Sequence, residues 1–132
     1  MIEAAAALIL IASTKGLPPP ESWRCRNEVE VWCDEAGCAA KAEGEVTPMD
    51  ISASSDGEIS VCAYTGCWEG KADYSEDAGR LLWRGDELPF VSAIEGTKGD
   101  VTLLIMRADG VGFVRAGGLA SPLTCTLKEA GE

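Results

Sequence analysis

The chain has 132 residues, which suits one domain, and its hydrophobic content of 46% is typical of a folded protein. Its 22 acidic and 11 basic residues give a net charge of −11, which argues against nucleic acid and anionic membranes as partners, because both attract Lys and Arg. The basic residues also look scattered, and the absence of histidine excludes Ser-His-Asp and Cys-His catalysis and the common zinc ligand sets.

The first residues of the chain match a signal peptide. Residues 4–12 read AAAALILIA, which is as long as the apolar part of a secretory signal and too short for a stable membrane span. We expect a signal peptide or its remnant over residues 1–14, a proline-rich linker over 15–22, and a periplasmic or secreted protein. Two alternatives stay open because Glu3 stands where signals carry Lys or Arg: an N-terminal helix packed on the domain, or a start codon placed too late in the gene.

The six cysteines are the most informative residues of the sequence. Four of them form two C-x-x-x-G-C patterns, and each pattern follows a segment of alternating polar and apolar residues. A four-residue hairpin loop that ends in glycine would set the two cysteines of each pattern opposite each other, within reach of a disulfide. The other two, Cys25 and Cys125, lie near the two ends of the domain and are expected to pair with each other. A zinc site or free thiols are the alternatives to the disulfides. The predicted disulfides are Cys33–Cys38, Cys62–Cys67 and Cys25–Cys125.

Short alternating segments separated by turn signals follow one another from residue 23 to residue 127. In the first, 23–33, Val29 and Val31 are expected on the face of the cysteines and Glu28 and Glu30 on the other face. The run Val101–Met106 is apolar on both faces and is expected to be central in a sheet. The other predicted strands are 38–46, 49–54, 58–64, 67–74, 81–84, 89–94, 111–116 and 123–127, with turns at 56–57, 85–87 and 109–110.

The number of strands and the spacing of the turns predict an all-β fold: an antiparallel barrel or sandwich of about eight short strands with three disulfides. No segment after residue 20 shows a helical period, which argues against alternating helices and strands. Residues 23–128 are expected to form this single domain. A link between its first and last strands favours a closed or nearly closed barrel.

Two segments look like ligand-binding loops but fail the corresponding tests. Asp73–Gly79 places oxygen-bearing side chains at alternate positions, but its glycine falls one position late for a calcium-binding EF-hand, so a solvated acidic turn is the better interpretation. Gly110-Val-Gly112 lacks the third glycine of a dinucleotide loop and lies between two strands, so we interpret it as a hairpin turn. No catalytic residue, metal or cofactor is predicted, and a pair of carboxylates is the only catalytic option left open.

The tip of the second cysteine hairpin is the candidate recognition loop. Tyr64 and Thr65 would form a rigid, disulfide-braced tip, with Trp68 just beyond it. Exposed Tyr and Trp side chains suit recognition because they offer a large contact area at a low cost in conformational entropy. The alternative is that Tyr64 and Trp68 only cover the end of the barrel. The other tryptophans are expected to pack in the core or at its rim: Trp23, Trp32 and Trp83.

The segment SVCAYTGCWEG at residues 60–70, preceded by Trp23-x-Cys25, resembles a pattern in short uncharacterised exported proteins of Gram-negative bacteria. The resemblance implies an exported disulfide-bonded protein, and no activity comes with it. The general shape is also similar to small periplasmic lysozyme-inhibitor barrels, although no loop here matches the motif that those proteins insert into an active site.

These observations predict a non-enzymatic binding module of the cell envelope that recognises a protein or a saccharide through a loop end. The net charge would suit a basic protein, such as a lysozyme-type enzyme. A calycin-like barrel that carries a small apolar ligand is the first alternative. A carboxylate-based hydrolase is the second.

Overall fold

Buried and exposed residues alternate along most strands of the protein, as in a sheet with one face against a core. The computed structural model describes residues 19–92 and 97–128, and the all-β fold class is confirmed over them. These residues contain no helix that could cross a bilayer. The strands are β1 (Ser22–Arg26), β2 (Val31–Asp34), β3 (Gly37–Ala40), β4 (Asp50–Ser54), β5 (Glu58–Ala63), β6 (Gly66–Lys71), β7 (Asp73–Asp77), β8 (Arg80–Val91), β9 (Lys98–Met106), β10 (Val111–Ala116) and β11 (Leu119–Lys128).

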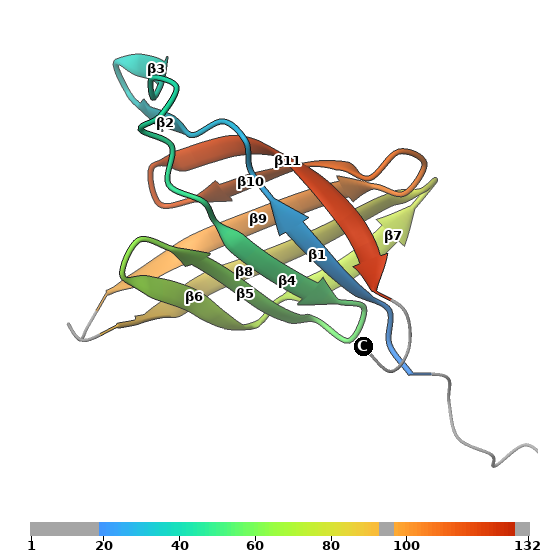
Figure 1. Ribbon diagram of the computed structural model, residues 1–132. Coiled ribbons are helices and arrows are strands. Elements are labelled where there is room, and N and C mark those ends of the chain that lie inside the picture. The colour runs from blue at the N-terminus through green and yellow to red at the C-terminus, as the bar shows by residue number, and fades with distance from the viewer. Residues whose placement is uncertain (1–18, 93–96, 129–132) are drawn as a thin grey trace, which may run out of the picture.

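Eight of these strands close into an antiparallel barrel (Figure 1). Their order around the barrel is β1–β4–β5–β6–β8–β9–β10–β11, and the pairing of β1 with β11 closes the ring. The β2–β3 hairpin projects from one end of the barrel, where Trp32 pairs with Leu119 of β11. Strand β7 pairs with the first part of β8. The closed ring decides between the barrel and the sandwich that the sequence left open.

Inward-facing side chains from the barrel strands fill the interior. Trp83 is fully buried, and its indole N–H donates a hydrogen bond of 2.7 Å to the carbonyl oxygen of Ser54. The ring of Tyr74 packs against Trp83 with a centroid distance of 4.8 Å. Trp23 is only 5% exposed. Trp23 and Trp83 are therefore core residues, as predicted, and the buried polar end of Trp83 has a partner, as burial requires.

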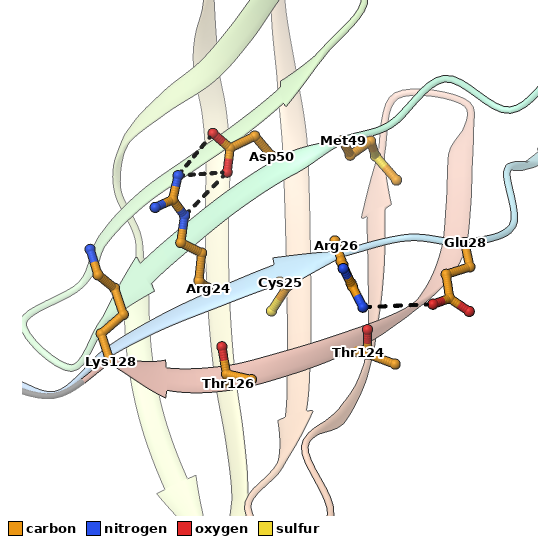
Figure 2. Close-up of a pocket in the computed structure, with 9 residues that line it drawn as sticks. All are labelled: Arg24, Cys25, Arg26, Glu28, Met49, Asp50, Thr124, Thr126 and Lys128. Atoms are coloured by element: carbon orange, nitrogen blue, oxygen red, sulfur yellow. Dashed lines mark hydrogen bonds and ion pairs between the residues drawn. The ribbon is translucent and has the colours of Figure 1, made fainter. Parts of the chain in front are cut away.

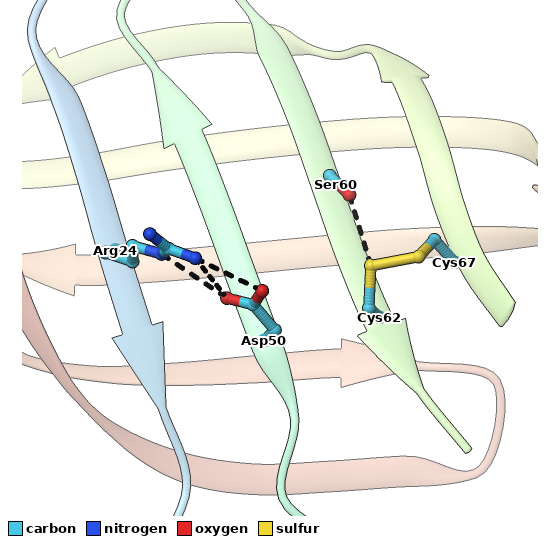
Figure 3. Close-up of a disulfide and its surroundings, with 5 residues drawn as sticks. All are labelled: Arg24, Asp50, Ser60, Cys62 and Cys67. Atoms are coloured by element: carbon cyan, nitrogen blue, oxygen red, sulfur yellow. Dashed lines mark hydrogen bonds and ion pairs between the residues drawn. A yellow bond between two sulfur atoms is a disulfide. The ribbon is translucent and has the colours of Figure 1, made fainter. Parts of the chain in front are cut away.

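All three predicted disulfides are present, and every one of the six cysteines takes part in one. Each disulfide joins directly opposed residues of neighbouring strands, with Cα–Cα separations of 3.9 to 4.0 Å. Cys25–Cys125 lies inside the barrel at the junction of β1 and β11. Cys62–Cys67 lies on the outer face, where Figure 3 shows it beside the strand that carries Asp50.

The two short disulfide hairpins have tighter turns than predicted. The residues just inside each cysteine pair are themselves paired, so each turn contains two residues rather than four. Gly66 also has a different role from the expected one. A Cβ at Gly66 would lie 2.6 Å from the carbonyl oxygen of Val91, so glycine is needed there because the end of β8 comes so close. Positive φ belongs instead to Tyr64, at 59°.

Several predicted strand boundaries were wrong. Segment 23–33 divides into β1 and β2, because the chain leaves the barrel between them and exposes Val29 by 41%. The predicted turn at 85–87 is a β-bulge inside the twelve-residue strand β8. The acidic segment 73–77 is strand β7 rather than a turn, since Tyr74 packs against the core. The return strand predicted at 38–46 already ends at Ala40.

The disulfides are expected to differ in their effect on stability. Replacing Cys25 and Cys125 by alanine should lower the free energy of unfolding by about 4–5 kcal/mol, because this bond closes a long loop in the unfolded chain. The same change at Cys33 and Cys38, only five residues apart, should cost about 2 kcal/mol. Guanidinium unfolding of both variants measures the difference. Equal losses would contradict the view that the long-range bond dominates.

Candidate functional site

One end of the barrel brings together three segments that are far apart in the sequence: the β2–β3 hairpin, the β5–β6 turn and the β10–β11 turn (Figure 1). The rings of Trp32 and Tyr64 meet there, with centroids 6.0 Å apart and planes tilted by 50°. A Cβ at Gly118 would lie 3.0 Å from the Trp32 ring, so glycine lets the β10–β11 turn pass close to the indole. We call this region, defined by Trp32, Tyr64 and Gly118, the Trp32–Tyr64 end.

A buried carboxylate, Glu30, lies at the centre of this end. Its side chain is fully buried. The indole Nε1 of Trp32 donates to Glu30 Oε2 at 2.5 Å, and the Tyr64 hydroxyl donates to the same oxygen. The backbone N–H of Thr47 donates to Oε1 at 2.7 Å. One carboxylate therefore satisfies the polar groups of both aromatic side chains and fixes their orientation from below.

These hydrogen bonds also set the protonation state of Glu30. Burial raises the pKa of the carboxyl, but the hydrogen bonds from Tyr64, Thr47 and Trp32 lower it more strongly. The balance lies below the ordinary value of 4.5. Glu30 is therefore ionised at neutral pH. Its oxygens face donors that belong to the protein, which suits a structural anchor rather than a general acid.

Side-chain-to-backbone hydrogen bonds hold the loop that delivers Glu30. The Asn27 amide donates to the carbonyl oxygen of Val29 at 3.2 Å and accepts from the N–H of Met49 at 2.8 Å. This bridge fastens the point where the chain leaves the barrel to the point where it returns. On the other side, the N–H of Val31 donates to Ser121 Oγ at 3.1 Å. Residues 27–31 are thus held at both sides, which turns Glu30 inward.

Tyr64 occupies a backbone conformation that favours glycine. Its φ of 59° is uncommon for a bulky residue, and it is the first of the two residues in the β5–β6 turn. The Tyr64–Glu30 hydrogen bond and the Cys62–Cys67 disulfide hold the turn in this shape. Strained backbone of this kind concentrates at functional sites. The ring nevertheless remains 52% exposed.

The structure separates the residues of the predicted recognition loop. Tyr64 and Thr65 lie exposed at the tip of the turn. Trp68 does not join them, because it packs against the core and its ring contacts Phe90 edge-on, with a centroid distance of 4.7 Å. The aromatic partner of Tyr64 is instead Trp32, which is 38% exposed and lies at the rim.

Sequence reasoning missed Glu30 as a site residue and Trp32 as part of the exposed surface. Strict alternation through 23–33 placed Glu30 on the outer face, but the chain bends at Glu28 and Val29 just after β1 ends, so that Val29 is exposed and Glu30 is buried. The two matching C-x-x-x-G-C hairpins were the one signal in the sequence from which a contact between Trp32 and Tyr64 could have been predicted.

Negative charge surrounds the aromatic pair. Residues 27–47, which contain the β2–β3 hairpin and both of its connections, carry six carboxylates and one lysine. A hollow of about 500 Å³ lies beside Trp32, between the hairpin and Gly118. Among the described residues, no group of three or more Cys, Asp or Glu side chains is placed to hold a metal ion. The exposed features of this end are two aromatic rings beside the carboxylates of residues 27–47.

Replacing Glu30 by glutamine tests the anchor. At neutral pH this change should lower the free energy of unfolding by roughly 1–3 kcal/mol, because a glutamine side chain cannot accept from all three donors. The folded-state pKa lies below the unfolded one, so the stabilisation is present above about pH 4.5 and disappears as the pH falls through the folded-state pKa. Urea unfolding across this range should show the two proteins converging in stability. A constant difference at every pH would contradict the role of the ionised carboxylate.

The chain matches no protein-family model, and no curated protein or solved structure is significantly similar to it.

Proposed function

We propose that the protein is a non-enzymatic binding module of the cell envelope that recognises a basic protein through the Trp32–Tyr64 end. One observation carries the proposal: a single buried carboxylate, Glu30, orients two half-exposed aromatic rings that come from different disulfide-braced hairpins. A fold that only needed to cover the end of the barrel would not require rings fixed in this way.

Fixed aromatic rings suit recognition for a thermodynamic reason. Binding normally costs free energy because flexible side chains lose freedom in the complex. Here the hydrogen bonds to Glu30 and the ring contact between Trp32 and Tyr64 have already removed that freedom in the unbound protein. Both polar groups are satisfied from inside, so the outer surfaces of the rings are free to contact a partner.

The charge around the rings favours a cationic partner. Trp32 lies on the hairpin that carries Asp34 at the end of β2 and Glu35 in its turn. A Lys or Arg side chain placed over the face of a tryptophan or tyrosine gains a cation–π interaction, and nearby carboxylates strengthen the attraction. A basic protein surface would supply such side chains. Neutral saccharides could stack on the rings but carry no positive charge for the carboxylates to attract, so we rank them second among the proposed partners.

Location in the envelope is supported by the disulfides. Three disulfides, two of them on exposed hairpins, persist only where the surroundings are oxidising. The predicted signal peptide over residues 1–14 lies outside the described residues. The two other predicted functions find less support: the barrel interior holds the packed side chains of Trp23 and Trp83, and within residues 19–92 and 97–128 we identify no carboxylate pair placed for hydrolysis.

Binding to a basic lysozyme-type enzyme, to a peptide library of mixed charge and to neutral glycans tests the proposal. Trp32→Ala and Tyr64→Ala should each weaken binding by at least ten-fold, as expected for a central aromatic contact. Tyr64→Phe keeps the ring but loses its hydrogen bond to Glu30, so its affinity should lie between those of the original protein and of Tyr64→Ala. Isothermal titration and peptide enrichment measure these effects, and binding should weaken as salt is added.

The matched control is Leu127→Ala, which removes an exposed apolar side chain outside this end and should leave binding unchanged. Three outcomes would overturn the proposal. Enriched peptides without basic residues would remove the charge argument, and salt-insensitive binding to neutral glycans would move the protein to the saccharide class. Basic ligands that bind the Trp32→Ala variant as well as the original protein would place the site elsewhere.

A further inference from the structure

A large part of the outer barrel wall carries no acidic side chain. The region comprises the outward-facing residues of β1, β10 and β11, of Arg80–Arg84 in β8 and of Thr102–Met106 in β9, which pair in one continuous sheet. Among these described residues there is neither Asp nor Glu, although the whole chain has 22 of them. We call this region the acid-free wall.

An apolar band crosses the acid-free wall. Leu82, Leu104, Phe113 and Pro122 lie side by side in register on β8, β9, β10 and β11. Phe113 is 53% exposed, and neighbouring Val111 is 38% exposed. Isolated exposed apolar residues are ordinary, but a contiguous row over four strands marks a surface that meets something apolar.

Cations flank the band on both sides. Arg84 and Arg115 lie in the adjacent row on one side, in register with Thr102. Arg84 also forms exposed ion pairs at the edge of the wall, with Asp73 of β7 at 3.5 Å and with Asp86 at 4.0 Å. Arg80 of β8 and Arg26 of β1 lie at the two ends of the row on the other side of the band. The wall thus gathers six of the eleven basic residues of the chain, and the scattering seen in the sequence was misleading. The six are Arg24, Arg26, Arg80, Arg84, Arg115 and Lys128.

A groove of about 760 Å³ lies at the β1 side of the wall (Figure 2). Arg24, Arg26 and Lys128 line it together with the hydroxyls of Thr124 and Thr126. Two carboxylates border the groove: Asp50 contacts Arg24 at 3.2 Å and Glu28 contacts Arg26 at 3.9 Å, as Figure 2 shows. Both ion pairs are largely exposed, so an incoming anion can compete for the guanidinium groups at little cost.

We propose that the acid-free wall docks on an anionic lipid surface, with the apolar band against the acyl-chain boundary and the flanking cations on the head groups. Apolar side chains bordered by Lys and Arg are the usual composition of such an interfacial contact. The hydroxyl and cation lining of the groove suits a head-group phosphate.

The charge of the wall also argues against the main competing occupant. A second copy related by two-fold symmetry would present the same wall, so that arginines would face arginines, while the carboxylates that pair with them, Asp50, Glu28 and Asp73, lie at its edges. Duplex nucleic acid is disfavoured for another reason, because phosphates would have to lie on the apolar row between the cations.

The acid-free wall is a different surface from the Trp32–Tyr64 end, and its docking on lipid does not depend on the basic protein proposed as a partner. The acidic β2–β3 hairpin lies outside the wall (Figure 1), so a membrane-docked molecule keeps its aromatic pair available. The two proposals can therefore fail separately, because each has variants that leave the other surface intact.

Flotation of the full chain with phosphatidylcholine vesicles, with and without phosphatidylglycerol, tests the proposal. The protein should float only with the anionic vesicles and should be released by salt. Each Arg near an anionic surface contributes about a five-fold gain in partitioning, so Arg84→Gln combined with Arg115→Gln should reduce partitioning by roughly 25-fold. Phe113→Ala should reduce it several-fold.

Lys71→Gln combined with Lys98→Gln is the matched control, because it removes the same charge from positions outside the wall. This control and Tyr64→Ala should float like the original protein. Failure to float with anionic vesicles would overturn the proposal. So would flotation that the Arg84, Arg115 and Phe113 changes leave untouched, since another segment would then carry the binding. Self-association of the original protein that is lost in Phe113→Ala, without flotation, would assign the band to a second copy.

Discussion

The pairing of β1 with β11 is the constraint on which the rest of the structure depends. Without it the eight strands would form an open sheet, and the inward side chains of both edges would face water. Cys25 and Cys125 lie directly opposite each other in this pairing and bond inside the barrel. Just beyond the seam, Arg107 from the β9–β10 turn binds Glu21 at 2.8 Å and Glu76 at 2.9 Å. A covalent bond in the core and a set of ion pairs at one end thus hold the first strand in place.

The closed barrel also explains how the two proposed surfaces coexist. A rigid cylinder can present different chemistry at its end and along its side, because neither surface has to move for the other to act. Carboxylates dominate the connections around β2 and β3, whereas arginines gather on β8, β10 and β1. A net charge of −11 therefore describes neither surface. The molecule is strongly asymmetric in charge.

The sequence predicted the architecture because its signals were local. Alternating residues predicted strands, and cysteines flanking a short turn predicted both hairpin disulfides. The site depended on interactions that local patterns do not record. Glu30 is buried because the chain bends at Glu28 and Val29 after β1 ends, in a loop that the hydrogen bonds of Asn27 hold in place. Alternation cannot anticipate a bend that depends on such a side chain. The acid-free wall was hidden for another reason: Arg26 and Arg80 fall on the same face, in one row across β1, β11, β10, β9 and β8, only through the register of strands that are distant in the chain.

The seam between β1 and β11 has a consequence for the order of events when the protein folds. The two cysteines that meet there are separated by 100 residues, so the ring cannot close until the last strand is available. Proteins whose contacts join distant parts of the chain fold slowly, since a long loop must close before those contacts can form. During synthesis β1 leaves the ribosome first, and its barrel partner β11 leaves last. The nascent chain consequently has no completed barrel core until β11 has been synthesised.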